Sequence, residues 1–562
     1  MVTAQAPQTI GDGATTRALA GDSRTIAVWT LVSRLTGFAR VATVAAVLGP
    51  TFFGNLFQTA LFVPYVVGEV LAATLIPAIL APRLVAALAS NDRPALDRLA
   101  GGFLGILLPV FGLAAAVILA ASPLLLPLLT AAVDDPVVRA HQIALGLPLL
   151  ATLLPQIPLL AVIGVGVAVQ HAHRAFAWPT AAPILENVGL VAVLGMIAVT
   201  WGTGIAIEQV TPAEAALLGA GSTLAVGLNA MAQVAGARRL GVRMWPRAGW
   251  RDAEVRGLAR IAGPSSAVAG MNSTGLFALM VASGQVPGGA VAFQIACNLF
   301  NLPIAMCARP LGSALLPLLS HALVRRDMSD FAGTYRSAIQ LALFLTLPAS
   351  LLFVGIPQAL AGAVSFGAMN EPHAVQLLAA ALAGMGAGIV GEALLIVSTS
   401  AAYARRDVGG PVAAAAIRLG VTAAGIALAL SLGGDAATVG MIGVAYAAAA
   451  IAGMAFLLLR QRYHLPPAPS AAAPRWASLL ATALLAMALP TSVALVLGDP
   501  EAGPALRIAY AAGLVALGGS AYLLLQRLRG APELRLLLGG ALSQGALGRL
   551  GRLFGSPGRP PA

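Results

Sequence analysis

Long apolar stretches dominate this chain of 562 residues and restrict what it can fold into. A transmembrane helix needs about 20 consecutive, mostly apolar residues. Fourteen such stretches are separated by polar or Pro/Gly-containing clusters, near residues 26–48, 55–82, 99–122, 142–169, 177–200, 214–235, 261–283, 288–319, 337–365, 374–401, 410–432, 436–459, 476–497 and 504–526. Only 10% of the residues are charged, against about 25% in soluble domains. The sequence therefore predicts an all-α polytopic membrane protein with 14 transmembrane helices.

The arginines give this arrangement an orientation. All 33 basic residues are arginine, and most of them fall in alternate loops. Basic residues concentrate in cytoplasmic loops, so we expect a multi-pass protein of the cytoplasmic membrane with both its N- and C-termini in the cytoplasm. Only Arg139 and Arg507 fall in loops on the other side. The net charge of +12 is thus explained by topology and does not indicate nucleic-acid binding.

A weak internal repeat divides the chain. Phe57–Pro64 and Phe293–Pro303 are similar, and each belongs to the second helix of a set of six. Residues 1–25 lack the apolar core of a signal peptide and are expected to form a disordered cytoplasmic tail. The predicted units are an N-lobe at 26–237, a basic cytoplasmic linker at 238–260, a C-lobe at 261–462, helices 13 and 14 at 463–526, and a basic cytoplasmic tail at 527–562.

Six motifs occur in a fixed order along the chain. They are SRLTGFAR at Ser33–Arg40, VPY at Val63–Tyr65, HRAFAWPTAAPILENVG at His173–Gly189, NLPIAMCARPLGSALLPLLS at Asn301–Ser320, SFGAMN at Ser365–Asn370 and YARRDVGGPV at Tyr403–Val412. Together they resemble the MurJ/MviN family of lipid II flippases, within the multidrug/oligosaccharidyl-lipid/polysaccharide exporter superfamily. The resemblance covers about residues 26–462, and the family's usual 14 helices agree with the stretches found above.

The resemblance implies a fold and an activity. It implies two six-helix lobes around a central cationic cavity, plus two C-terminal helices. It also implies alternating access that carries a lipid-linked peptidoglycan precursor, bound by its pyrophosphate, from the inner to the outer leaflet. Arg34 and Arg40 match the family's two arginines of helix 1. Asn55 stands where the family has an acid, and Asn298 where it has an arginine; we include both among the candidate substrate-binding residues.

Seven charged side chains fall inside the predicted spans. Each costs about 2.5–3.5 kcal/mol at a helix centre on insertion scales, so intramembrane charges face a cavity or one another. The set comprises Arg34, Arg40, Arg309 and Arg418, with Glu69, Glu186 and Glu392. Arg34 and Arg40 point about 120° apart on an ideal helix, so facing one cavity requires a bend, which Gly37 permits. Arg309, followed by Pro310, is a third candidate for binding phosphate.

The repeat suggests a role for two of these charges. Aligning Pro179 with Pro411 places Glu186 and Arg418 seven residues further on in opposite lobes. We expect these two residues to form an inter-lobe gate, or else to be independent cavity residues. Glu69 and Glu392 are further candidates for gate or cavity charges.

Other kinds of site are not supported. The pair His171 and His173 has no further ligands nearby in the sequence, and the two cysteines, Cys297 and Cys307, lie in apolar helix. We therefore expect no metal, no cofactor and no enzymatic activity. The expected partners are a polyprenyl-pyrophosphate-linked glycan, membrane lipids and cell-envelope synthesis proteins. Three alternatives remain: a flippase for another polyprenyl-linked glycan, a drug/cation antiporter of the same superfamily, and a non-transporting cell-envelope scaffold.

Overall fold

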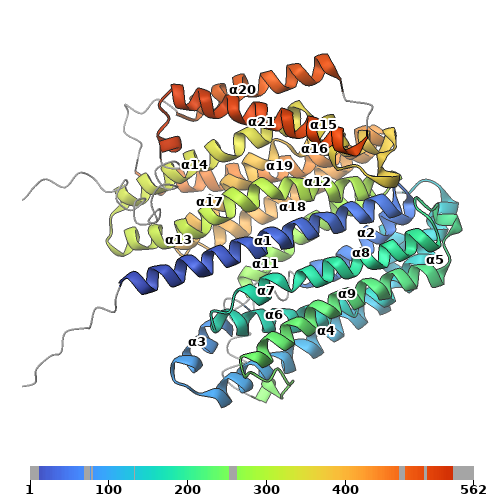
Figure 1. Cartoon of the computed structure of the whole chain (residues 1–562), viewed down its shortest axis with the longest axis horizontal. Helices are drawn as coiled ribbons and strands as arrows, with labels where there is room; N and C mark the ends of the chain where they lie inside the picture. The colour runs from blue at the N-terminus through green and yellow to red at the C-terminus, as the bar shows by residue number, and fades with distance from the viewer. Residues whose placement is uncertain are drawn as a thin grey trace, which may run out of the picture.

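The first helix, α1 (Asp12–Leu48), extends along most of the molecule, and the other long helices run roughly parallel or antiparallel to it (Figure 1). The computed structural model describes residues 12–68, 76, 80–131, 133–251, 263–466, 475–498 and 503–535. Within these ranges the regular structure is helical, without β-strands. Helix α1 begins at Asp12, inside the range expected for the 1–25 tail, and residues 1–11 lie outside the described residues.

Among the described residues, eleven helices are long and apolar enough to cross a membrane, and one bent pair, Pro372–Met385 with Gly388–Ala404, adds a twelfth span if it is counted as one. Two shorter apolar helices, Phe52–Gly68 and Ala267–Ser283, lie where the second and seventh spans were expected. The prediction of an all-α polytopic membrane protein is confirmed. The count of 14 spans stays a prediction, because parts of these two spans lie outside the described residues.

The N-terminal half is built around one continuous apolar core, which extends from Val44 to Met244. Its further helices are α2 (Phe52–Gly68), α3 (Ala81–Ala89), α4 (Arg93–Leu129), α5 (Pro136–Leu153), α6 (Gln156–Ala172), α7 (Ala177–Ala181), α8 (Pro183–Thr200) and α9 (Pro212–Arg239). Proline at the first helical positions fixes several of these starts, and Asp92 and Asp135 cap α4 and α5 by accepting backbone N–H bonds.

The C-terminal half repeats this arrangement. It contains α11 (Gly263–Ser283), α12 (Gly289–Pro303), the π-helix η5 (Ile304–Ala308), α13 (Arg309–Val324), α14 (Met328–Gly355), α15 (Pro357–Val364), the 3₁₀-helix η6 (Gly367–Asn370), α16 (Pro372–Met385), α17 (Gly388–Ala404), α18 (Gly409–Leu432) and α19 (Asp435–Arg462). The last two helices, α20 (Arg475–Leu497) and α21 (Pro504–Leu528), pack together and against α14 and α15. Figure 1 shows them at the edge of the bundle, beyond the C-terminal half.

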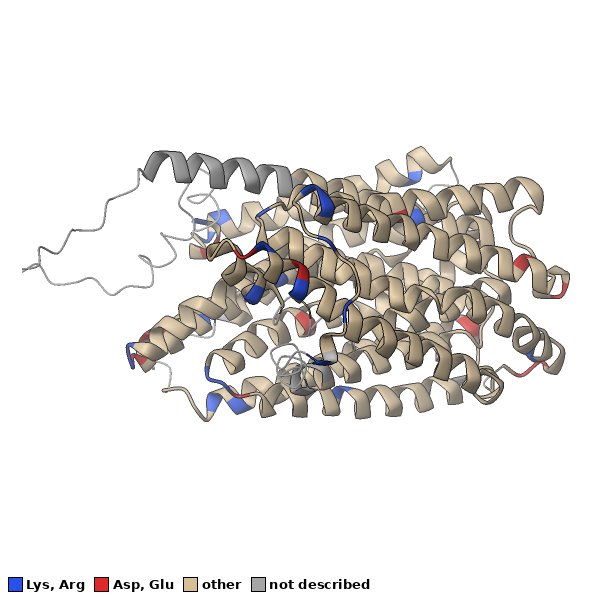
Figure 2. Cartoon of the chain, turned by 90° about the horizontal axis from the view of Figure 1, so that it is seen from below, with Lys and Arg blue, Asp and Glu red and all other residues tan. Residues whose placement is uncertain are grey.

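The bundle has two distinct ends. We call the arginine-rich end the one that holds the loops at 90–92, 173–176, 240–251, 325–327, 405–408 and 463–466; most of the blue (arginine) segments of the ribbon in Figure 2 gather there. The opposite end is where α1 ends at Leu48 and α2 begins at Phe52. Since successive spans reverse direction, the arginine-rich loops all fall at one end, as the sequence predicts.

The two halves make close contact at the opposite end. Gly288 (φ +75°) lies against Pro50, and Gly367 (φ +55°) lies against the backbone of Ala46. Any Cβ at either position would overlap the neighbouring chain, and both backbones are left-handed, which favours glycine. Val41 and Ala45 of α1 also belong to the core of the C-terminal half. The last turns of α1 therefore join the halves.

The linker after α9 is held by the N-terminal half. The backbone N–H groups of Arg243 and Arg247 donate to Asp97 Oδ1 (2.7 Å) and to the carbonyl of Gly101 (2.9 Å). The linker backbone at Arg247 also lies directly over Gly105 of α4. Up to Arg251, the described part of the expected 238–260 linker is thus packed on α4. Residues 252–260 lie outside the described residues.

Candidate functional site: intramembrane charge pairs

An ion pair joins α1 to α8. Arg40 Nη1 donates to Glu186 Oε1 at 3.0 Å, with 31% and 22% of the two side chains exposed. Pro183 starts α8, which places Glu186 in its first turn, where a carboxylate is favoured by the helix dipole. The second carboxylate oxygen, Oε2, accepts from Asn229 Nδ2 of α9 at 3.0 Å. Three helices of the N-terminal half therefore converge on one carboxylate.

Buried amides extend this site away from the ion pair. Gln233 Nε2 donates to Asn229 Oδ1 at 3.3 Å, and Gln170 Nε2 donates to Gln233 Oε1 at 2.7 Å. On the other side of Glu186, Asn187 Nδ2 donates to Thr36 Oγ1 of α1 at 3.1 Å. None of these amides was among the residues expected from the sequence. The sequence contains a pattern that could have predicted two of them, because Asn229 and Gln233 are four residues apart and therefore lie on one face of an apolar helix.

A second ion pair lies in the C-terminal half. Arg418 Nη2 of α18 is 3.0 Å from Glu392 Oε2 of α17, and only 13% and 20% of these side chains are exposed. Gly453 of α19 makes room for the arginine stem, since a Cβ there would come within 3.0 Å of it. A small cavity of about 20 Å³ adjoins Arg418 and is also lined by Asn272, Thr422 and Tyr446.

In this conformation the two residues of the expected inter-lobe gate are apart, and the gate stays a prediction. The structure does not bring Glu186 and Arg418 together; each is paired within its own half of the chain. Equal depth in the membrane was the basis for the prediction, but depth does not determine which neighbouring helix supplies the partner. Glu392, expected only as a cavity charge, is the partner of Arg418.

The candidate phosphate ligands fall into two groups. Arg40 is engaged with Glu186, whereas Arg34, six residues earlier on α1, is exposed and has no hydrogen-bond or ion-pair partner among the described residues. Arg309 is also exposed, and the only described hydrogen bond of its guanidinium is a long one of 3.4 Å to Asn301 Oδ1. It follows directly on the π-helix η5, where π-turns often mark functional sites. Helix α1 continues through Gly37 without a break, from Asp12 to Leu48.

The three remaining candidates have different positions. Asn55 is buried in the contact between the halves: Nδ2 donates to the carbonyls of Gly284 (3.0 Å) and Val286 (2.6 Å), and Oδ1 accepts from the Ala290 N–H (3.0 Å). These bonds use its donors and an acceptor lone pair, so in this conformation its role is structural. Asn298 is half-buried and donates to Gln294 O of its own helix at 2.8 Å. Glu69 lies outside the described residues.

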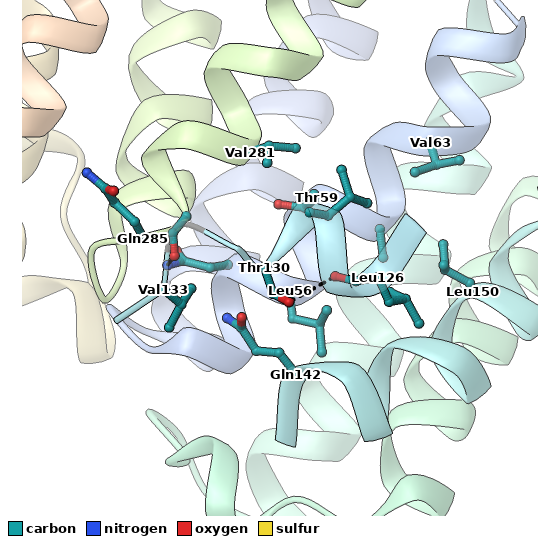
Figure 3. Close-up of a pocket in the computed structure, with 14 residues that line it drawn as sticks. Leu56, Thr59, Val63, Leu126, Thr130, Val133, Gln142, Leu150, Val281 and Gln285 are labelled. Atoms are coloured by element: carbon teal, nitrogen blue, oxygen red, sulfur yellow. Dashed lines mark hydrogen bonds between the residues drawn. The ribbon is translucent and has the colours of Figure 1, made fainter. Parts of the chain in front are cut away.

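A cavity of about 40 Å³ lies beside Asn55, between α2, α4, α5 and the end of α11 (Figure 3). Its polar lining includes Thr59, Thr130, Gln142 and Gln285. Gln142 is buried, and its Oε1 has no partner among the described atoms. A cavity of this size has room for a few water molecules. No group of three His, Cys, Asp or Glu side chains within the described ranges is placed to hold a metal ion.

Many apolar spans, two intramembrane charge pairs and exposed arginines within spans define a polytopic membrane protein of the transporter class. The comparison with known families identifies the family within this class. The chain belongs to the lipid II flippase MurJ family, whose family model matches residues 44–500. This confirms the resemblance found in the sequence.

Individual relatives agree with this assignment. The chain is 27% identical over 403 residues to a probable lipid II flippase MurJ of Rhizobium tropici, covering 70% of this chain and 72% of that protein. It is 25% identical over 460 residues to the lipid II flippase MurJ of Burkholderia cenocepacia, covering 79% and 84% of the two chains.

Two solved structures share the fold. One is a lipid II flippase MurJ in an inward closed conformation, with a TM-score of 0.67, 15% identity and coverage of 90% of this chain and 98% of that one. The other is a multidrug resistance MATE family transporter in an inward-facing conformation, with a TM-score of 0.59, 15% identity and coverage of 77% and 95%. The chain therefore shares its fold with both proteins.

Proposed function

We propose that this protein is a flippase that moves lipid II from the inner to the outer leaflet of the cytoplasmic membrane by alternating access. Membership of the lipid II flippase MurJ family over residues 44–500 supports the substrate. The all-helical bundle of apolar spans supports the transport class. The two halves and the intramembrane charges supply the parts that such a mechanism needs.

We place the arginine-rich end in the cytoplasm, with both termini on that side. The positive-inside distribution of the loops supports this orientation. It makes the end joined by Asn55, Gly288 and Gly367 the outer one. Contact between the halves at the outer end corresponds to a state in which substrate enters from the cytoplasmic side.

The observation that carries the substrate-binding proposal is the unpaired guanidinium of Arg34. An arginine within a span is costly unless it meets water or a counter-charge, and Arg34 is exposed without a described partner. A guanidinium binds phosphate oxygens with two parallel hydrogen bonds. In this proposal Arg34 and Arg309 bind the pyrophosphate of the substrate. Arg40 acts with them by exchanging its bond to Glu186 for one to a phosphate oxygen.

Two measurements test this proposal. The first asks whether the chain complements a strain depleted of its essential lipid II flippase. The second follows lipid II flipping in reconstituted vesicles. Alanine at Arg34 should abolish both activities and lysine should restore part of them, whereas alanine at Arg326, an exposed arginine of the arginine-rich end outside the spans, should leave both intact. Wild-type flipping by the Arg34→Ala variant would refute the assignment.

The cation-antiporter alternative has less support. Its proton or sodium site would need a free carboxylate. Of the three candidate glutamates, Glu186 and Glu392 are each paired with an arginine, and Glu69 lies outside the described residues. The flippase assignment predicts a different energetic coupling. Moving an anionic headgroup outward is favoured by an inside-negative potential, by about 2.3 kcal/mol per charge per 100 mV. Flipping in vesicles should therefore accelerate with an imposed inside-negative potential and need no cation gradient.

A further inference from the structure

A long groove runs along the outer face of the N-terminal half. It has a volume of about 1130 Å³ and lies between α6, α8 and α9. Leu224, Leu228 and Met231 of α9 form its floor and are among the exposed large hydrophobic side chains. An exposed apolar groove on a membrane-spanning bundle is filled by lipid chains, so the question is whether one lipid is selected.

The groove carries one charge, at one end. Of the residues that line it, only Arg238 is charged, and it lies in the last turn of α9 at the arginine-rich end. The guanidinium of Arg238 is exposed and has no hydrogen-bond or ion-pair partner among the described residues. The next residue, Arg239, does not line the groove and instead stacks over Trp178 at 4.2 Å, while Trp178 Nε1 donates to Ala232 O at 2.7 Å. One free guanidinium, that of Arg238, thus lies at one end of the apolar groove.

The dimensions fit a lipid of one leaflet. Along α9 the groove lining runs from Arg238 to Gly221, a rise of about 26 Å at 1.5 Å per residue, and the part nearest Arg238, as far as Gly227, spans about 16 Å. One leaflet contributes about 15 Å to a hydrocarbon core of about 30 Å. A chain whose headgroup sits at Arg238 would therefore end near Gly227, where the groove is open: a Cβ at this glycine would meet no atom within 4 Å.

We propose that the groove binds an anionic phospholipid of the bilayer, with its phosphate on Arg238 and one acyl chain along α9 as far as Gly227. Arginine suits a phosphodiester because it offers paired donors and stays charged. Basic residues at the ends of apolar grooves are a recognised basis for binding anionic lipid headgroups. None of the residues that line the groove belongs to the charge pairs described above.

The headgroup contact can be tested with a matched pair of arginine variants. The full-length protein is titrated with phosphatidylglycerol or phosphatidylcholine of identical acyl chains, and binding is followed by native mass spectrometry and by the rise in unfolding temperature. Arg238→Gln should weaken phosphatidylglycerol binding about tenfold or more, the effect of losing a charge-assisted hydrogen bond, and should remove the preference over phosphatidylcholine. Arg243→Gln removes the same charge from the same end, outside the groove, and should keep both.

The contact with the acyl chain can be tested with a matched pair of glycine variants. Gly227→Leu fills the groove, whereas Gly195→Leu adds the same side chain to α8, also at a position open within 4 Å but outside the groove. Only Gly227→Leu should weaken binding of the long-chain lipid, while short-chain phosphatidylglycerol should bind both variants alike. Equal binding by the two arginine variants, or by the two glycine variants, would overturn the proposal. So would displacement of phosphatidylglycerol by stoichiometric polyprenyl phosphate, which would assign the groove to the substrate's own tail.

Discussion

Arg40 and Glu186 form a 3.0 Å ion pair between α1 and α8, although 146 residues separate them in the chain. The pair connects the helix that joins the two halves to the polar centre of the N-terminal half. Removing one partner leaves a partly buried charge without compensation. The pair is about a quarter exposed, so its effect lies between those of buried and surface pairs.

We expect Arg40→Met or Glu186→Gln to lower the free energy of unfolding by about 1–3 kcal/mol. The double variant, Arg40→Met with Glu186→Gln, should lose less than the sum of the two single losses, because it leaves neither charge without its partner. Unfolding of the purified variants in detergent, analysed as a double-mutant cycle, measures the coupling. Additive single effects would show that the two residues do not interact.

The pair Arg418–Glu392 is less exposed than Arg40–Glu186. Breaking it should therefore cost more, about 3–5 kcal/mol, the range typical of buried pairs. The same unfolding measurement on Arg418→Met and Arg40→Met compares the two sites directly. A smaller loss at Arg418 than at Arg40 would contradict the burial argument.

Asn55 should control the contact between the halves at the opposite end. Asn55→Asp keeps the shape but places carboxylate oxygens against the carbonyls of Gly284 and Val286, which now accept bonds from its amide. We expect Asn55→Asp to open that end more than Asn55→Ala does. A buried polar group left without its hydrogen-bond partner costs about 1–3 kcal/mol, and a charged group costs more. The measurement is labelling of a cysteine introduced at Thr59, inside the adjoining cavity.

The control for this prediction is Gln285→Ala. Gln285 lines the same cavity without a described hydrogen bond to the N-terminal half, so its loss should change labelling little. Equal labelling of Asn55→Asp and the parent protein would show that Asn55 does not hold the halves together.

Gly105 should be indispensable for seating the linker on α4. A Cβ there would lie 1.6 Å from the carbonyl oxygen of Arg247, whereas a Cβ at Gly112, seven residues on, would meet nothing within 4 Å. Gly105→Ala should detach the linker and speed tryptic cleavage after Arg247 and Arg251, while Gly112→Ala should not. Equal cleavage rates in the two variants would mean that the linker does not depend on this contact.

Asp407 should contribute a pH-dependent part of the stability. Hydrogen bonds from Arg460, at 2.7 and 3.1 Å, together with the Gly410 N–H, hold the pKa of the Asp407 carboxyl below its usual value. A carboxyl with a lowered folded-state pKa stabilises the protein above its unfolded-state pKa of about 3.9, and this stability is lost as the pH falls through the folded-state pKa. Asp407→Asn should therefore reduce stability at pH 7 and flatten its decline below about pH 4, as acid unfolding curves can show.

The sequence alone predicted most of the features that follow from insertion into a membrane. Each expected span contains an apolar helix in the structure, because the thickness of the bilayer sets a minimum length that can be read from hydropathy. It also identified the intramembrane charges, because charged residues in apolar runs are rare and stand out. The six motifs, taken together and in order, were sufficient to identify the family.

Only the tertiary structure decided which of these charges meet. Glu186 could be placed at the depth of Arg418, but packing gave it Arg40 and Asn229 instead, because depth along a helix does not reveal its neighbours. Packing likewise made Asn55 a contact between the halves and not an exposed ligand. The intramembrane charges were thus determined by the sequence, whereas their partners followed from how the helices pack, which depends on contacts between residues far apart in the chain.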